Sequence, residues 1–186
     1  MKSIVNLLFE AKMLKDIPRA GFAFLGAGSE SIAAHSFQTA FIGYVMSRVL
    51  PGVDAQRLIS MCLVHDLPEA RIGDQNYVNK QYVTVDEAKA VADATRHLSF
   101  GRDMAGLIDE FNEQASFEAQ LAHDADQLAF VLDLKAAADI GAKTPDKWLP
   151  TVSGRLKTEI GRQMADEILK TQWDGWWRDG YEEPNQ

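Results

Sequence analysis

Residues 61–74, MCLVHDLPEARIGD, join an apolar run directly to a group of polar side chains. The run ends on His65 and Asp66, a proline follows two residues later, and Glu69 and Asp74 complete the segment. Burying an imidazole or a carboxylate without a partner is unfavourable, so few apolar runs end on both. The pair at the end of this run must therefore find partners elsewhere in the chain.

Helical periodicity extends outward from this segment over most of the chain, and strand signals are weak. Asp54 can cap the helix that leads into the segment, and the proline after it closes that helix. The stretch 73–83, GDQNYVNKQYV, has no sustained period and is predicted as a long surface loop, which is often functional in a compact domain. The predicted helices span about residues 4–17, 32–50 (capped by Ser29 or Ser31), 55–66, 85–98, 102–112, 116–140 and 151–170. The sequence therefore predicts an all-α fold.

The composition fits one domain that buries a sizeable core, with 186 residues of which 46% are hydrophobic and 25% charged. A net charge of -8 disfavours nucleic acid or an anionic membrane as the main partner, and no segment approaches the roughly 20 apolar residues of a membrane span. The single cysteine, Cys62, excludes an intrachain disulfide and favours a reducing compartment. We expect a cytoplasmic protein, since the short apolar stretch near the N-terminus lacks signal-peptide features.

Two of the four histidines are candidates for a metal site. His35 lies inside a predicted helix in ESIAAHSFQTA, and His65 precedes Asp66. Considered alone, His35 is more simply a core histidine, and the His65-Asp66 pair is an ion pair at a helix end. Carboxylates gathered near histidines favour a functional site, and both Glu69 and the later segment EAQLAHDADQLAF supply them. Imidazole nitrogens with carboxylate oxygens suit a divalent Mn, Fe, Co, Ni, Zn or Mg ion.

The later segment offers two aspartates, and helical phase does not choose between them. Asp124 shares a face with Leu121 and Leu128, whereas Asp126 shares one with Ala122. Both faces are apolar enough to be buried against a metal site. The residues alone leave the two alternatives open.

The ordered series ESIAAHS, LVHDLPEARIGD and EAQLAHDADQL, preceded by DIPRAG, resembles the HD-domain phosphohydrolases, in particular the small single-domain 5′-deoxynucleotidases. The matching motifs extend from about Pro18 to Leu128. The resemblance implies a helical HD-domain bundle and a homodimer. It also implies one domain over residues 1–186, with a motif-bearing core at about 18–140 and a C-terminal helix and aromatic tail at 148–186.

The resemblance further implies one divalent metal ion bound by His35, His65, Asp66 and a late aspartate. The family's Asp-Ala-Asp-x-Leu pattern places this ligand at the second aspartate, and we therefore select Asp126 rather than Asp124.

The remaining polar residues fit phosphomonoester hydrolysis. By resemblance, Glu69 and Asp74 handle water and protons, and Arg19 binds the phosphate through its planar fork of donors. Lys80 is a second candidate cation, although a solvated loop lysine is an equal alternative. The expected substrate is a deoxyribonucleoside monophosphate. The alternatives are a triphosphohydrolase or another small-phosphoester hydrolase, and a non-catalytic protein that binds metal or nucleotide.

One position departs from the family pattern. The branch commonly carries a bulky aromatic residue after the arginine, and Ala20 stands there in this chain. Phe22 or Phe24 could supply the missing aromatic surface, which in the family helps to pack the sugar or base. A core role is the simpler expectation for each. Nucleoside selectivity is therefore left open.

Other chemically suggestive residues receive structural interpretations. His97 has no neighbouring carboxylate and His123 follows an alanine-rich face, so we expect surface or supporting roles and a single metal ion. The tryptophans and the tyrosine of WDGWWRDGYEEPNQ lack the cations of a nucleic-acid groove. They are expected to pack against the body of the protein or against a second subunit.

Overall fold

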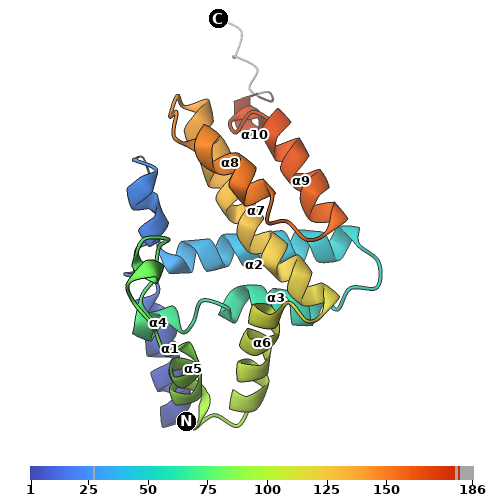
Figure 1. Ribbon diagram of the computed structural model, residues 1–186. Coiled ribbons are helices and arrows are strands. Elements are labelled where there is room, and N and C mark those ends of the chain that lie inside the picture. Colours follow the sequence, from blue (N-terminus) through green and yellow to red (C-terminus); the bar gives the residue numbers. More distant parts are fainter. Residues whose placement is uncertain (27, 179, 181–186) are drawn as a thin grey trace, which may run out of the picture.

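The computed structural model describes residues 1–26, 28–178 and 180, and it confirms the all-α prediction. No strand occurs in these residues, where extended backbone pairs only in an isolated bridge between Pro18 and Ser31. The helices (Figure 1) are α1 (Lys2–Met13), α2 (Ile32–Val49), α3 (Ala55–Val64), α4 (Glu69–Ile72), α5 (Glu87–Thr95), α6 (Gly101–Glu113), α7 (Phe117–Asp139), α8 (Pro145–Ser153), α9 (Glu159–Lys170) and α10 (Gly175–Arg178), with short 3-10 turns η1 (Ala20–Phe24) and η2 (Asn79–Gln81).

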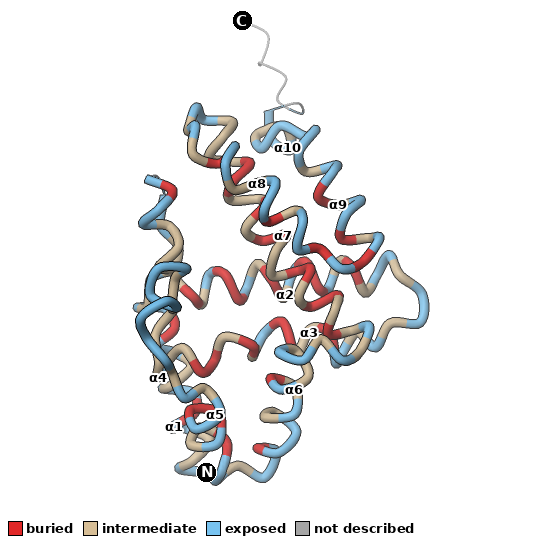
Figure 2. Tube along the Cα trace, in the orientation of Figure 1, coloured by how far each residue is buried: buried red, intermediate tan, exposed pale blue. Residues whose placement is uncertain are grey.

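The main core lies where α2, α3 and α7 meet. In Figure 1, α2 and α3 run one above the other and α7 crosses both. Met46, Leu58, Met61, Leu121 and Leu128 are completely buried between these three helices. Each such side chain contributes about 1.5–3 kcal/mol by leaving water. Figure 2 shows the same concentration of buried residues on the facing sides of the helices. The core thus fixes the relative positions of the helices that carry the histidine and aspartate motifs.

Local capping explains where several helices begin. The side chains of Ser31, Asp54 and Ser116 each accept a hydrogen bond from a backbone N–H in the first turn of α2, α3 and α7. Such a cap stabilises a helix by about 1 kcal/mol. The structure selects Ser31 over Ser29 as the cap of α2 and confirms the predicted cap of α3.

The predicted helix over residues 151–170 is wrong as a continuous element, because α8 ends at Ser153 and α9 begins at Glu159. The buried carboxylate of Asp124 accepts hydrogen bonds from the backbone N–H groups of Lys157 and Thr158 at 2.7 and 2.8 Å. These bonds hold the backbone out of the helical pattern. Gly154 ends α8 and the side chain of Thr158 caps α9, so the contact with α7 stabilises a break that these two residues also favour locally.

The region 73–83 is largely irregular, as predicted, with η2 as its only helical turn. The short helix α4, directly after the His65-Asp66 pair, was not predicted. No helix in the described part of the chain is long and apolar enough to cross a bilayer. Tyr181, part of the predicted aromatic tail, lies outside the described residues.

Candidate metal-binding site

The three core helices each contribute one side chain to a buried polar cluster. His35 lies in α2, His65 directly follows the last residue of α3, and Asp126 lies in α7. One nitrogen or oxygen atom from each of these residues lies within 4.8 Å of the others. The closest approach is 2.9 Å, between Nε2 of His35 and Oδ1 of Asp126. The core therefore brings two imidazoles and a carboxylate to one point.

Asp66 faces the same point from the turn after α3. Its Oδ2 atom lies 3.2 Å from Nε2 of His65 and 3.7 Å from Nε2 of His35. It is not part of the tighter three-residue group in the described structure, but it approaches both imidazole nitrogens. A second carboxylate oxygen is thus available beside the cluster.

Three atoms of this cluster are buried without a hydrogen-bond partner among the described residues: Nδ1 of His35, and, facing the centre of the cluster, Nε2 of His65 and Oδ2 of Asp66. The other ring nitrogen of His65, Nδ1, lies 2.9 Å from the carbonyl oxygen of Cys62, to which it can donate. In the neutral ring, which is the form that binds a metal, that bond leaves the lone pair on Nε2. A buried unpartnered polar atom is unfavourable by about 1–3 kcal/mol. A divalent cation would satisfy both atoms that face the centre, and the donor set of nitrogens and carboxylate oxygens fits such an ion.

The charged groups of the cluster shift one another's pKa values toward the ionised forms. Burial alone would lower the pKa of His65, but the neighbouring Asp66 and Asp126 raise it to about 9. Burial alone would raise the pKa of Asp126, yet the hydrogen bond from His35 and the nearby positive charges hold it well below its usual range. The carboxylates are therefore ionised at neutral pH. An ionised carboxylate is the form that binds a cation.

Asp124, the alternative to Asp126, points in another direction. Its Oδ2 atom accepts hydrogen bonds from the backbone N–H and the hydroxyl of Thr158 at 2.8 and 2.6 Å, and its Oδ1 atom accepts one from the N–H of Lys157. Both oxygens are thus engaged with the segment before α9. The side chain is completely buried there and is absent from the three-residue group.

Arg19 lies beside the cluster, just before η1. One of its guanidinium nitrogens, Nη1, is 3.8 Å from Oδ2 of Asp66, and Nε is 3.9 Å from Oε2 of Glu30. The next backbone N–H, that of Ala20, donates a 2.6 Å hydrogen bond to Oδ2 of Asp74. One of the two predicted proton-handling carboxylates therefore also fixes the segment that carries the arginine.

Glu69 stands at the start of α4, next to the same cluster. Its Oε2 atom is buried and has no hydrogen-bond partner among the described residues. Burial, together with the negative charges of Asp66 and Asp74, raises the pKa of Glu69 to about 8. A carboxyl group in this environment holds a proton at neutral pH and can deliver it, which is the property of a general acid.

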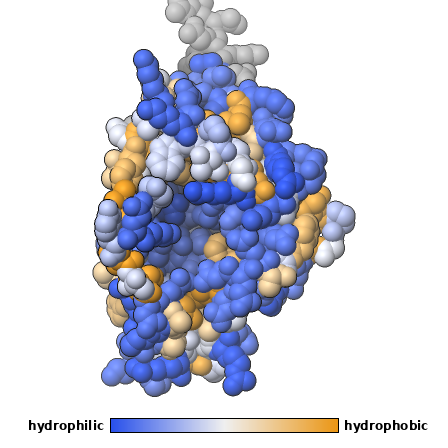
Figure 3. Space-filling model, viewed as in Figure 1, coloured by the Kyte–Doolittle hydropathy of each residue, from blue (hydrophilic) through white to orange (hydrophobic). Residues whose placement is uncertain are grey.

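The cluster forms the floor of a cavity of about 370 Å³. Figure 3 shows a recess in the hydrophilic surface on this side of the molecule. The predicted site residues that line the cavity are Arg19, His65, Asp66, Glu69, Asp74, Lys80 and Asp126. His35 lies behind them and is completely buried. All eight predicted residues thus gather at or directly behind one cavity.

Part of the cavity wall was not predicted from the sequence. Trp148 of α8 and Arg155 of the α8–α9 connection line it. Arg155 also approaches Oε1 of Gln127 at 3.4 Å, and Gln127 donates a 2.7 Å hydrogen bond to Oδ2 of Asp126. No sequence signal links these residues to the histidine motifs, because their position depends on how α8 and α9 pack against α7.

Phe22 and Phe24 both line the cavity, and Phe22 also packs against Phe130 with ring centroids 6.4 Å apart. An aromatic wall is therefore present despite Ala20. His97 is exposed, and Nδ1 of His123 lies 3.7 Å from Asp124. Among the described residues, neither histidine belongs to the buried group.

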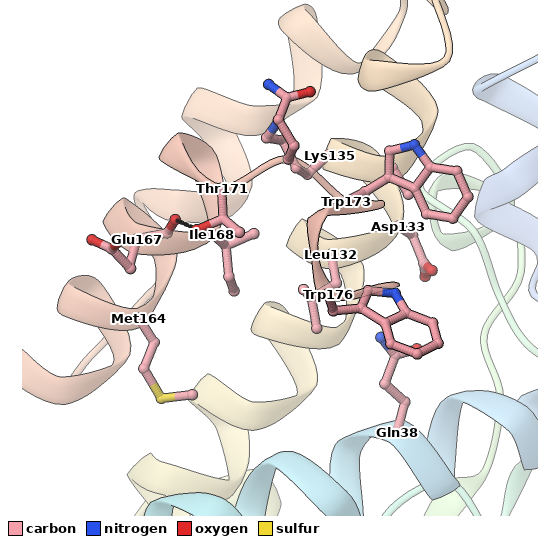
Figure 4. A pocket seen from close by; sticks show the side chains of 12 residues that line it. Gln38, Leu132, Asp133, Lys135, Met164, Glu167, Ile168, Thr171, Trp173 and Trp176 are labelled. Atoms are coloured by element: carbon pink, nitrogen blue, oxygen red, sulfur yellow. Dashed lines mark hydrogen bonds between the residues drawn. The ribbon is translucent and has the colours of Figure 1, made fainter. Parts of the chain in front are cut away.

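A second cavity, of about 560 Å³, lies between α7, α9 and the C-terminal segment and shares no lining residue with the first. Figure 4 shows Trp173 and Trp176 on one side of it and Met164 of α9 on the other. The backbone N–H of Trp173 donates a 3.0 Å hydrogen bond to Asp139 of α7. This part of the predicted aromatic tail therefore contacts the body of the protein.

Comparisons with known proteins agree with this geometry. The 5′-deoxynucleotidase HDDC2 of Dictyostelium discoideum is 29% identical over 131 residues, covering 64% of this chain and 69% of the relative. The zebrafish (Danio rerio) protein of the same name is 24% identical over 149 residues, covering 77% and 74%. The crystal structure of the PH0347 protein from Pyrococcus horikoshii OT3 superposes with a TM-score of 0.75 at 29% identity, covering 89% of this chain and 98% of that one.

The family model described as "HD domain" matches residues 11–168, a range that includes every residue of the buried cluster. The match covers most of the chain and agrees with the helical architecture and the converging histidines and aspartates. This chain therefore belongs to the HD-domain family of metal-dependent phosphohydrolases.

Proposed function

We propose that this protein is a 5′-deoxynucleotidase that converts deoxyribonucleoside monophosphates to nucleoside and phosphate. The observation that carries the proposal is the buried group of His35, His65 and Asp126, of which His65 and Asp126 line a cavity that is also lined by Arg19 and Glu69. The relatives named 5′-deoxynucleotidase support the same substrate class.

We further propose that His35, His65, Asp66 and Asp126 bind one divalent ion, whose identity among Mn, Co, Ni, Fe, Zn and Mg is open. The unpartnered Nε2 of His65 and Oδ2 of Asp66 support this ligand set. When bound, the ion would polarise a phosphate oxygen and lower the pKa of a water molecule.

The other proposed roles belong to side chains around the ligands. Arg19 neutralises charge on the phosphate, because a guanidinium donates two parallel hydrogen bonds to phosphate oxygens. Glu69, with its raised pKa, holds the proton that the leaving alkoxide needs. For Asp74, a part in proton transfer would fall to Oδ1, since Oδ2 binds the N–H of Ala20.

The residues that line the cavity support a nucleoside monophosphate as the substrate. Within the described residues, Arg19 is the one lysine or arginine of the cavity that lies within 4 Å of a carboxylate of the cluster. Phe22, Phe24 and Trp148 offer surfaces for a base or sugar. Lys80 and Arg155 also line the cavity, and these two cations support triphosphohydrolase activity as the second candidate.

Assays after metal removal would test both candidates. Each divalent ion is added back singly, and dAMP, AMP and dATP are compared by the release of phosphate, pyrophosphate and triphosphate. The proposal expects metal-dependent phosphate release, fastest from dAMP. Faster release of intact triphosphate from dATP would support the second candidate, and inactivity on every nucleotide would support a non-catalytic role.

We also propose a cytoplasmic homodimer. The cytoplasmic location rests on the single cysteine, and the dimer on an exposed aromatic stripe of α2 formed by Phe37, Phe41 and Tyr44, which are 70%, 57% and 49% exposed. The ring centroid of Phe41 lies 6.3 Å from that of Phe37 and 6.2 Å from that of Tyr44. A stripe on one helix can pair with its own copy across a two-fold axis.

A further inference from the structure

The two histidines of the cluster differ in what faces their second ring nitrogen. A histidine that binds a metal through one nitrogen carries its proton on the other, and this N–H is nearly always donated to a carboxylate, a carbonyl or water. For His65 the acceptor is the carbonyl oxygen of Cys62, 2.9 Å from Nδ1. For His35 the corresponding nitrogen, Nδ1, is buried and has no hydrogen-bond partner among the described residues.

The carboxylate of Glu30 lies beside this nitrogen. Its Oε2 atom is 3.9 Å from Nδ1 of His35 and also lacks a hydrogen-bond partner in the described structure. The side chain is only 10% exposed, so solvent reaches it poorly. A buried donor and a buried acceptor thus face each other at a separation about 1 Å longer than a hydrogen bond.

The same oxygen also faces the arginine of the cavity. Oε2 of Glu30 is 3.9 Å from Nε of Arg19, and the backbone N–H of Arg19 donates a 2.9 Å hydrogen bond to the carbonyl oxygen of Glu30. Glu30 immediately precedes Ser31, which caps α2, so its backbone is held in place. One carboxylate oxygen therefore lies between a proposed metal ligand and the proposed phosphate-binding residue.

We propose that Glu30 is a positioning residue, which accepts a hydrogen bond from Nδ1 of His35 and steadies Arg19 with the same oxygen. The inference rests on the metal site proposed above. In the described structure Nε2 of His35 faces Asp126 at 2.9 Å, so the ring proton can reside on Nε2. A ligand at Nε2 needs the proton on Nδ1, and a small rotation of Glu30 supplies the acceptor.

This arrangement links metal binding to phosphate binding. Glu30→Ala removes the acceptor for His35 and the anion beside Arg19, so both affinities fall. Glu30→Gln keeps a side-chain oxygen that can accept from Nδ1, but it removes the negative charge beside Arg19. The glutamine variant therefore separates the two effects, with a smaller loss of metal affinity and a clear loss of phosphate affinity.

The first test is titration of the full-length protein with Mn²⁺ alone, followed by inorganic phosphate on the metal-loaded protein. Removal of an outer partner of a metal-bound histidine typically weakens metal affinity by about 10- to 100-fold, which is the loss expected for Glu30→Ala. Asp139→Asn is the matched control, because the side chain of Asp139 is only 12% exposed, close to that of Glu30, yet its carboxylate pairs with Lys135 and with the N–H of Trp173, outside the metal cluster. The control should change the affinity less than about twofold, well below that range.

The second test determines which ring nitrogen of His35 carries the proton. In the Zn²⁺-loaded protein, long-range ¹H–¹⁵N correlation spectra should show His35 with its proton on Nδ1, and Glu30→Ala should shift this nitrogen while Asp139→Asn should not. Unchanged Mn²⁺ affinity in a folded Glu30→Ala protein, an unprotonated Nδ1, or equal losses in the control would each overturn the inference. Failure of the unaltered protein to bind metal would instead overturn the proposed function, and the inference with it.

Discussion

The carboxylate of Asp124 binds both the backbone N–H and the side-chain hydroxyl of Thr158, a residue 34 positions further along the chain. Two residues later on α7, Asp126 instead faces His35. Neighbouring aspartates on one helix thus serve different parts of the molecule, one at the start of α9 and the other in the buried cluster. Separate substitutions should distinguish them.

Asp124→Ala should destabilise the protein without removing the metal site. The substitution leaves the N–H groups of Lys157 and Thr158 without their acceptor, which is unfavourable by about 3 kcal/mol in total. Thermal unfolding should show a midpoint lower by roughly 10 °C. Mn²⁺ titration at a temperature where the protein is folded should give the unaltered affinity, whereas Asp126→Asn should lose it. The reverse pattern would assign the ligand to Asp124.

Glu69→Gln should lower kcat while leaving metal content and folding nearly unchanged. The amide has the shape of the carboxyl group but cannot transfer its proton, and a lost general acid or base reduces the rate on the order of a hundredfold or more. Steady-state kinetics with dAMP, together with metal analysis of the purified variant, would measure this. Full activity would exclude Glu69 from the reaction.

Arg155→Ala should raise KM for a nucleotide about tenfold with little change in kcat, since a hydrogen bond to a charged group is worth about 1.5–3 kcal/mol. Arg102→Ala is a suitable control, because Arg102 lines a different surface depression. An equal effect of both substitutions on KM would indicate general electrostatic attraction instead of a contact in the cavity. Arg155 contacts Gln127, which in turn donates a hydrogen bond to Asp126. A parallel measurement of Mn²⁺ affinity would show whether loss of Arg155 also disturbs this proposed metal ligand.

Asp133→Asn should stabilise the protein at alkaline pH. Burial, followed by the nearby charge of Glu30, raises the pKa of Asp133 to about 7 in the folded protein, while the unfolded value is about 3.9. Between these values the folded state binds one more proton than the unfolded state, so stability falls as pH rises from about 4 to 7. The asparagine variant lacks this loss. Its unfolding midpoint should exceed that of the unaltered protein at pH 8 by a few degrees, and the difference should shrink at pH 5.

Phe41→Glu should convert the proposed dimer to a monomer. The substitution places a charge in the middle of the α2 stripe, and in a two-fold interface that charge would meet its own copy. Light scattering coupled to size-exclusion chromatography gives the molar mass directly. Leu63→Glu, at an exposed position on α3, is the control and should leave the mass unchanged. A monomeric unaltered protein would exclude the dimer.

Features that depend on nearby residues could be predicted from the sequence. The caps Asp54 and Ser116 act on N–H groups three residues away, so the helices they begin were correctly placed. The order of the histidine and aspartate motifs also indicated which side chains converge. Helical phase alone could not, because Asp124 and Asp126 both lie on faces that α7 buries in part.

Features that depend on distant contacts could not be predicted. The backbone before α9 is held by Asp124, whose partners lie more than thirty residues away. Trp148 and Arg155 reach the cavity only because α8 packs against α7. The position of Glu30 between His35 and Arg19 likewise follows from the fold and not from spacing along the chain.

The placement of α8 bears on how enzymes of this architecture diverge. The proposed metal ligands all precede residue 127, whereas Trp148 and Arg155 come from a later segment of the chain that closes over the same cavity. Mutations in this later segment can therefore alter the shape of the cavity while the proposed metal ligands are retained. The segment around α8 is accordingly where new substrate preferences would arise most readily during evolution.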